Sequence, residues 1–313
     1  MRIRFAVAAA VPLLWVSTSL MAQAIPAAVK KAEASIDGER IRAHVKFLSD
    51  DLLEGRGPGL RGSELAAKYI ATQFALDGLK PGGDDGSYLQ EINFVGMKVV
   101  PATTSFSLVP LHGSVVDLAY GEDYTVSNQT LTADARVDAP IVFVGYGVTA
   151  PEFGWDDYAG VDVKGKVVLC IVGDPPSNDP KFFGGKALTY YGRWTYKFEQ
   201  AARMGAVGAL IIHRTDLASY GWDVVKNSFT SEKTYLRDDK NPQLQAASWI
   251  QLAVAKKLFA ASGKDLDVEM TAAGQRGFKA VELPVRLKAQ VESTVRPFQS
   301  ANVVGILPGV NAG

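Results

Sequence analysis

Three histidines are the first residues to test for chemistry, because hydrolysis by zinc requires at least three protein ligands, usually including histidine. His44 lies in a predicted helix, His112 in a turn beside Gly113, and His213 at the end of an apolar strand. None has the His-x-x-x-His or His-x-Asp spacing that places two ligands on one ion. The sequence therefore predicts structural histidines and identifies no metal-ligating, cofactor-binding or catalytic residue.

Paired acidic residues are the next candidates, because carboxylate oxygens bind calcium. The pairs are Asp50-Asp51, Asp84-Asp85, Asp156-Asp157 and Asp238-Asp239. None belongs to the regular ligand spacing of a calcium loop. We expect these acids to lie on solvated turns and helix starts.

A glycine motif follows a predicted strand at residues 145–150. Gly145, Gly147 and Ala150 match the Gly-x-Gly-x-x-Gly/Ala pattern of dinucleotide-binding loops. That chemistry needs a helix to begin at once, so that its amino end can hold a pyrophosphate. Pro151 and Gly154 follow instead. The sequence therefore favours turn glycines over a nucleotide site, and no Gly-x-Ser-x-Gly elbow indicates serine catalysis.

The single cysteine, Cys170, lies in the apolar run of residues 167–172. A thiol in such a run is typical of a buried strand, where it packs as a small apolar side chain. We expect Cys170 to be structural, and no disulfide can form within the chain.

The first 24 residues have the order of a secretory signal peptide. Arg2 and Arg4 precede an apolar run over residues 5–16, and Ala22 and Ala24 form a small-residue cleavage site. A membrane anchor is the alternative, but a spanning helix needs about 20 apolar residues and this run is interrupted by serine and threonine from residue 17. The sequence predicts a secreted or periplasmic protein that leaves the membrane after signal cleavage.

The composition predicts a globular mature chain. Hydrophobic residues make up 47% and charged residues 21%, which excludes disorder and a bundle of membrane spans. Lysine plus arginine equals aspartate plus glutamate at 33 each, so no net charge attracts nucleic acid or an acidic membrane. Its length favours two domains, or one domain that carries an insertion.

Two amphipathic helices that flank a glycine loop are predicted to open the mature chain. Asp37 is placed to cap the first, and Ser63 to cap the second, which Gly78 and Pro81 end. The apolar faces are Ile41, Val45, Leu48 and Leu52 in the first helix, and Leu65, Tyr69, Ile70 and Phe74 in the second. Both faces need a partner surface.

Short extended and helical segments alternate after residue 88, which indicates an α/β architecture. Strands are predicted at 88–95, 104–109, 139–146, 166–172, 209–212 and 281–291, and helices at 193–204 and 249–262, the latter stopped by Gly263. Residues 302–309 are predicted to form a buried strand that reaches a turn. No internal repeat or low-complexity tract appears.

Motifs along most of the mature chain resemble one family. Residues 47–56 (FLSDDLLEGR), 62–70 (GSELAAKYI), Phe74 and 78–81 (GLKP) closely resemble the amino-terminal signature of secreted zinc aminopeptidases of metallopeptidase family twenty-eight. A resemblance to the protease-associated domain, which is inserted in many members, covers residues 142–147 (VFVGYG), 157–158 (DY), 164–169 (KGKVVL) and 201–212 (AARMGAVGALII). Residues 302–309 (NVVGILPG) resemble the strand that returns to the peptidase domain.

The resemblance implies an incomplete zinc-aminopeptidase α/β domain interrupted by a protease-associated α/β insert. The implied parts are a signal peptide (1–24), the amino-terminal part of the peptidase domain (25–130), the protease-associated domain (131–285) and a truncated return to the peptidase domain (286–313). Family members are metallopeptidases that hydrolyse amino-terminal residues of peptides with two zinc ions and a glutamate general base.

The family's His-x-Asp motif and its other ligands follow the returning strand, where residues 309–313 stand instead. No family site residue carries over to this sequence. We expect no zinc bound to this chain and no activity alone, so its status as an enzyme stays open.

Three hypotheses follow from these motifs. The favoured hypothesis is a fragment or truncated product of a secreted zinc aminopeptidase. The main alternative is an exported peptide-binding or interaction module built on the protease-associated fold, and an exported protein of unrelated activity is the least favoured. In the family, the insert lies beside the active-site cleft. The candidates to face a peptide are Tyr190, Tyr191, Trp194 and Trp222, although aromatic side chains are more commonly buried.

Without a peptidase sheet to cover it, the helix face of Leu65, Tyr69 and Phe74 is predicted to be exposed. The insert is predicted to be the better folded half.

Overall fold

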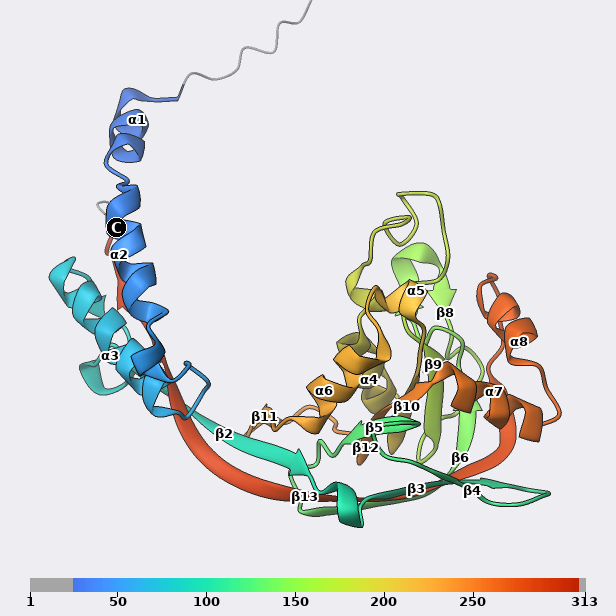
Figure 1. Cartoon of the computed structure of the whole chain (residues 1–313). Coiled ribbons are helices and arrows are strands. Elements are labelled where there is room, and N and C mark those ends of the chain that lie inside the picture. Colours follow the sequence, from blue (N-terminus) through green and yellow to red (C-terminus); the bar gives the residue numbers. More distant parts are fainter. Residues whose placement is uncertain (1–24, 310–313) are drawn as a thin grey trace, which may run out of the picture. The chain divides into compact units, whose positions relative to one another are not determined.

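The computed structural model describes residues 25–309, so the predicted signal peptide and cleavage site (residues 1–24) and residues 310–313 lie outside the described part (Figure 1). The chain forms two compact units. The first unit ends at Gly55 and the second begins at Arg56.

The first unit consists of helices with little buried surface. It contains α1 (Ala27–Ala34), α2 (Gly38–Leu48) and the short helix η1 (Asp51–Leu53). The predicted cap is confirmed, because the Asp37 carboxylate accepts a hydrogen bond from the Glu39 backbone N–H. The apolar face of α2 lies open, with Ile41 at 53% and Val45 at 58% exposure.

The second unit begins with α3 (Arg61–Leu76). The prediction that Ser63 caps this helix is wrong. Leu60, in extended backbone and without a capping side chain, precedes the helix, and the Ser63 N–H already donates to the Leu60 carbonyl within the first turn. The predicted stop is confirmed, because Gly78 follows the helix with φ at 75° and allows the Leu79 N–H to reach the Phe74 carbonyl.

The apolar side of α3 is incompletely covered, as predicted. Leu65 is 37% exposed, and Tyr69 and Phe74 are half-buried. The Phe74 ring meets the ring of Tyr88 edge to face, with 6.4 Å between their centroids.

The sheets contain both parallel and antiparallel pairs, which confirms the α/β class. The strands are β1 (Lys80–Pro81), β2 (Leu89–Val99), β3 (Ser105–Pro110), β4 (Val116–Leu118), β5 (Tyr124–Ser127), β6 (Asp134–Phe143), β7 (Thr149–Ala150), β8 (Trp155–Asp156), β9 (Val167–Ile171), β10 (Gly208–His213), β11 (Lys233–Leu236), β12 (Ala246–Gln251), β13 (Val281–Val303) and β14 (Gly305–Ile306). The main sheet has the order β11-β2-β13-β6-β9-β10-β12-β5, with β3 on β13 and β4 on β3. Two small pairs, β1-β14 and β7-β8, complete the strands of the described chain.

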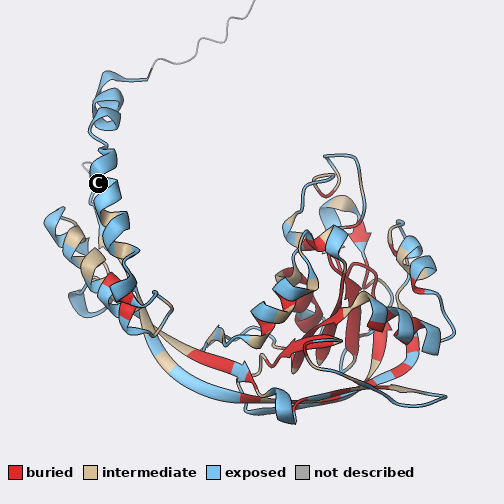
Figure 2. Cartoon of the chain, in the orientation of Figure 1, coloured by how far each residue is buried: buried red, intermediate tan, exposed pale blue. Residues whose placement is uncertain are grey.

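Four parallel strands, β6, β9, β10 and β12, form the buried centre of this sheet (Figure 2). Their near-continuous apolar runs are typical of strands covered on both faces. Successive residues point to opposite faces, so that Leu169 and Ile171 belong to one core while Val168 and Cys170 belong to the other.

Helices cover both faces of the parallel strands. The helices α7 (Leu252–Ala261) and α8 (Leu266–Ala273) bury residues in the first core, and α4 (Trp194–Arg203), α5 (Thr215–Ala218) and α6 (Trp222–Thr230) do so in the second. The short helices η2 (Asp84–Gly86), η3 (Pro101–Thr103), η4 (Pro151–Phe153) and η5 (Tyr190–Gly192) lie in the connections. Among the described residues, no helix combines the length and hydrophobicity needed to cross a membrane.

The prediction of a helix over residues 249–262 is partly wrong. Residues up to Gln251 extend β12, which pairs with β10 on one side and β5 on the other. The Trp249 side chain, 1% exposed, packs in the second core and holds this segment in the sheet. The helix begins only at Leu252, and Gly263 ends it with φ at 69°, as predicted.

The long strand β13 links distant parts of the chain. Its first half pairs with β6 and β3, and its second half pairs with β2 from Ser293 to Val303. The register with β6 shifts between Leu283 and Arg286, beside Pro284, which has no backbone N–H to donate.

The final described residues are exposed, so the expectation of a buried strand over 302–309 is wrong. Ile306 is 50% exposed and Leu307 is 79% exposed. β14 pairs with the two-residue strand β1, and this small sheet offers too little surface to bury them.

Candidate functional site

The carboxyl ends of the parallel strands form the strongest candidate site. β6, β9 and β10 run in the same direction, so the loops that follow them meet at one edge of the sheet. Ligands of open α/β sheets bind in crevices at this edge. A pocket of about 420 Å³ lies there and is lined by Gly173, Asp174, Pro175, Pro176, Ser177, Asn178, Gly185, Lys186, Ala187, Leu188, Asp216 and Leu217. We call it the edge pocket.

Hydrogen bonds hold the wall of the edge pocket. The Asp174 carboxylate accepts from the Thr189 backbone N–H at 2.7 Å and from its hydroxyl at 2.8 Å, which ties the two ends of the loop together. The Asp216 carboxylate, which also lines the pocket, accepts from the Arg214 guanidinium at 3.0 Å, and this bond lowers the pKa of Asp216. Both carboxylates are therefore held in place by hydrogen bonds from neighbouring residues.

A buried lysine lies beneath the loop that forms this wall. Lys197 of α4 is fully buried, and its ammonium donates to the Gly173 carbonyl at 2.9 Å. Burial lowers the pKa of Lys197 to about 8, while Cys170, Asp174 and Asp157 act in the opposite direction. The amine thus anchors the loop, and its burial favours the uncharged form.

Asp157 is a second buried charge, and the expectation that its acidic pair is solvated is wrong for this residue. Asp156 is exposed, but Asp157 is 2% exposed and accepts from the Val148 N–H at 3.0 Å and the Trp155 indole N–H at 2.8 Å. Burial raises the pKa of Asp157 to about 7, although both N–H groups favour the charged form. This carboxylate fixes the turn after β6.

The glycine motif forms that same turn. Gly145 and Gly147 have φ of 60° and 64°, which a glycine adopts without strain. The motif leads into β7 and η4 rather than a nucleotide-binding helix. The prediction of turn glycines is confirmed.

Cys170 is buried, as predicted. It is fully enclosed in β9, and burial raises the pKa of its thiol to about 12. A thiol in this state is a poor nucleophile.

The candidate aromatic residues differ in how much surface they present. Tyr190 is 54% exposed, and its hydroxyl donates to the Glu199 carboxylate. Tyr191 and Trp194 are half-buried. Trp222, also half-buried, donates its indole N–H to the Gly121 carbonyl. Among these four side chains, Tyr190 offers the most accessible ring to a ligand.

The histidines do not form a metal site with other described side chains. Within residues 25–309, no three His, Cys, Asp or Glu side chains are grouped to hold an ion. His213 is buried at the end of β10, with its Nε2 3.1 Å from the Tyr220 carbonyl, and burial lowers its pKa. Its ring is therefore held by the backbone of the segment that follows β10.

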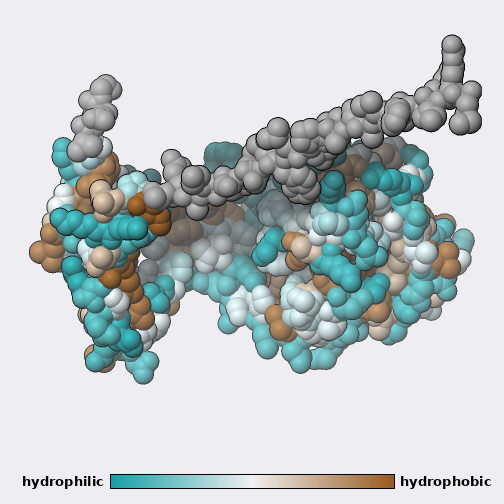
Figure 3. Space-filling view, turned by 90° about the horizontal axis from the view of Figure 1, so that it is seen from above, coloured by the Kyte–Doolittle hydropathy of each residue, from teal (hydrophilic) through white to brown (hydrophobic). Residues whose placement is uncertain are grey.

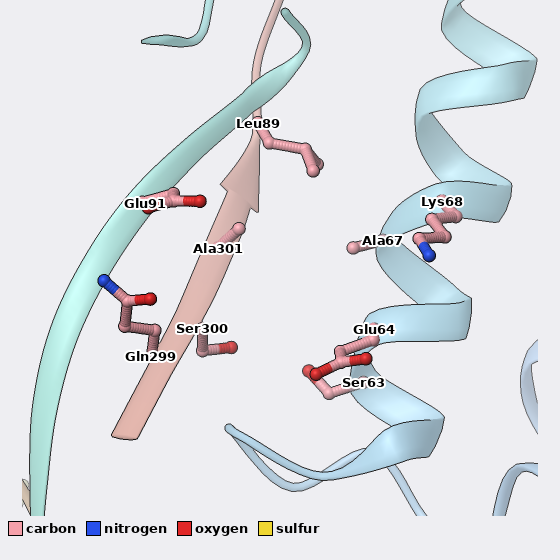
Figure 4. Close-up of a pocket in the computed structure, with 9 residues that line it drawn as sticks. All are labelled: Ser63, Glu64, Ala67, Lys68, Leu89, Glu91, Gln299, Ser300 and Ala301. Carbon is pink, nitrogen blue, oxygen red and sulfur yellow. The ribbon is translucent and has the colours of Figure 1, made fainter. Parts of the chain in front are cut away.

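A smaller pocket of about 240 Å³ lies between α3 and the strands β2 and β13 (Figure 4). Ser63 and Glu64 point from the helix toward β13, where Ser300 points back toward the helix. Ala67, Leu89 and Ala301 add apolar surface. The pocket is thus a small recess between the helix and the two strands, with both polar and apolar lining.

The face of the second unit visible on the right of Figure 3 is mainly hydrophilic, with hydrophobic side chains scattered over it. Sequence reasoning did not identify Lys197, and it placed Asp157 in a solvated acidic pair rather than in the core. The signal for Lys197 was its position in α4, between the buried Tyr196 and Phe198 and four residues before the buried Ala201. For Asp157, the signal was its place between the aromatic residues Trp155 and Tyr158.

No protein-family model matches the sequence, and a comparison with curated proteins finds no match. Among solved structures, the chain is similar to an aminopeptidase from Aneurinibacillus sp. strain AM-1, with 19% sequence identity and a TM-score of 0.39 over 88% of this chain and 49% of that chain. It is also similar to BSAP, a zinc aminopeptidase from Bacillus subtilis, with 14% identity and a TM-score of 0.31 over 88% of this chain and 48% of that chain. The chain spans about half the length of these solved structures.

Proposed function

We propose that this chain is the amino-terminal half of an exported zinc aminopeptidase of metallopeptidase family twenty-eight. One observation carries the proposal: the two segments that resemble the peptidase domain fold together, although most of the chain separates them. Lys80 and Pro81 of β1 pair with Ile306 and Gly305 of β14. The whole of β2 pairs with the second half of β13. A segment that leaves a domain and returns to it in this way is typical of an insert.

In this proposal, residues 131–285 are the protease-associated insert. The parallel strands β6, β9, β10 and β12 lie within this range and have a core on each face, which supports an independent domain. Residues 124–127 also join this sheet, because β5 pairs with β12. The proposed boundary after residue 285 lies within β13, which serves both parts as a shared strand.

The proposed role of the insert is to shape peptide access. Tyr190 lies on the loop between β9 and α4, which together with Asp216 and Leu217 of α5 lines the edge pocket, and its ring is exposed to a peptide. The described half does not fit a zinc centre, because its buried histidine is bonded to a backbone carbonyl and residues 25–309 contain no group of three metal-ligating side chains. We therefore assign the two zinc ions and the general base to residues outside this half.

The test is to read the coding DNA beyond codon 313. The proposal expects an open frame that encodes a His-x-Asp motif within a few codons, followed by acidic ligands. A stop codon with no such remnant in any frame would contradict the proposal and favour the exported peptide-binding module.

A further inference from the structure

A second pocket, of about 480 Å³, lies along α4 and shares no residue with the edge pocket. Its volume falls within the range of small-molecule sites. It is lined by Gln129, Trp194, Thr195, Phe198, Glu199, Ala202, Arg203, Tyr235, Asp239, Asn241, Pro242 and Gln243. We call it the α4 pocket.

Aromatic side chains form a rigid wall of the α4 pocket. The Trp194 ring packs against Phe198 and Phe229, with centroid distances of 6.0 Å and 5.8 Å. Phe198 and Phe229 are buried, so they hold the half-exposed indole in place. Tyr235 of β11 adds a second half-buried ring. Such a wall offers a flat apolar surface at little cost in side-chain entropy.

The charged groups of the α4 pocket are already bonded within the protein. Asp239 accepts hydrogen bonds from the backbone and side-chain N–H groups of Asn241 and from the Gln243 amide, at 2.8 to 3.2 Å. Glu199 accepts from the Tyr190 hydroxyl and lies 3.6 Å from the Arg203 guanidinium. A charged ligand would therefore have to displace existing partners.

Neutral polar groups in the same pocket remain available. The Gln129 side-chain oxygen accepts from the Leu244 N–H, which leaves its amide N–H groups free. Asn241 and Gln243 bond to Asp239 through their side-chain N–H groups, so their side-chain oxygens have no hydrogen-bond partner among residues 25–309. The Trp194 indole N–H, in the same lining, has none among these residues either. Free donors and free acceptors thus lie together beside the aromatic wall.

We propose that the α4 pocket binds a neutral saccharide. Each sugar hydroxyl both donates and accepts a hydrogen bond, which matches this mixture of amide donors and acceptors. The C–H face of a sugar ring is apolar and packs on Trp194 or Tyr235. A peptide is less well matched, because peptides are commonly held by an open strand edge or by charged groups, whereas the available groups here are side-chain amides and an indole. The proposal does not depend on aminopeptidase activity.

The test is isothermal titration calorimetry on the full chain with methyl β-glucoside, N-acetylglucosamine and tetra-alanine as probes. We expect one of the two saccharides to bind with a dissociation constant in the millimolar range and tetra-alanine to give no heat. Asn241→Ala, which removes the free side-chain oxygen of Asn241 together with its side-chain hydrogen bond to Asp239, should weaken binding about fivefold. Trp194→Phe, which keeps an aromatic ring in the core, should weaken it about tenfold.

Gln275→Ala provides the matched control, because Gln275 is an exposed amide outside the α4 pocket. It should leave the affinity unchanged. The proposal is overturned if neither saccharide binds, if tetra-alanine alone binds, or if Asn241→Ala and Trp194→Phe bind the saccharide as tightly as the unmodified chain does.

Discussion

Replacing Lys197 with methionine removes a buried charge while nearly preserving the side-chain volume. The ordinary pKa of lysine is 10.5, and burial lowers that of Lys197 to about 8. One pKa unit corresponds to about 1.4 kcal/mol, so keeping this amine charged in the folded state costs about 3 kcal/mol. Methionine avoids that cost but leaves the Gly173 carbonyl without the lysine donor, which costs about 1 to 3 kcal/mol.

The lowered pKa of Lys197 predicts that the difference in free energy of unfolding between the unmodified chain and Lys197→Met depends on pH. Between about pH 8 and about pH 10.5, the unfolded chain keeps its Lys197 proton while the folded chain loses it, so the free energy of unfolding rises with pH. The stability of the unmodified chain relative to Lys197→Met should therefore increase by about 3 kcal/mol across this window. At the lower pH the two proteins should differ by less than about 2 kcal/mol.

Urea unfolding at both pH values, followed by tryptophan fluorescence, measures this difference. Lys256→Met is the control, because Lys256 is half-exposed and paired with Asp267 at 2.9 Å, so its ammonium remains in contact with water. The difference in free energy of unfolding between Lys256→Met and the unmodified chain should be the same at both pH values. If the difference between the unmodified chain and Lys197→Met stays constant with pH, the reasoning about the buried amine is refuted.

Three further outcomes follow from buried groups. From pH 4 to pH 7, Asp157→Asn should become more stable relative to the unmodified chain by up to about 4 kcal/mol, because Asp157 keeps its proton in the folded chain and releases it in the unfolded chain. Urea unfolding at both pH values measures this change, and a stability difference that stays constant with pH would contradict it. Gly147→Ala should lose about 2 kcal/mol in urea unfolding, because its backbone is left-handed and a Cβ would lie 3.2 Å from that of Cys170; Gly160→Ala, left-handed in open space, should lose less. Cys170 should react with iodoacetamide only after unfolding, and rapid labelling of the folded chain would show that it is accessible.

Local structure could be predicted where a short apolar run is bounded by turn residues. Residues 104–109, 166–172 and 209–212 form the strands β3, β9 and β10 within one or two residues of the expected limits. Glycines that require a left-handed backbone, such as Gly147 and Gly263, also marked turns and helix ends correctly. These features depend on neighbouring residues in the sequence, so a short sequence pattern is enough to predict them.

Features that depend on distant contacts could not be predicted. Trp249 belongs to a strand because β5 and β10 pair on both sides of it, although its own sequence also fits a helix. Lys197 and Asp157 are ordinary charged residues until the fold buries them. The edge pocket arises from the parallel order of β6, β9 and β10, and the α4 pocket from segments that meet only in the folded chain.

The most direct test of the proposed function compares zinc content and leucyl-p-nitroanilide hydrolysis in two purified proteins. One is residues 25–313, and the other is the mature product of the complete reading frame. We predict two zinc ions and turnover in the complete product, with neither in residues 25–313. Stoichiometric zinc and turnover in residues 25–313, or their absence from the complete product, would contradict the account.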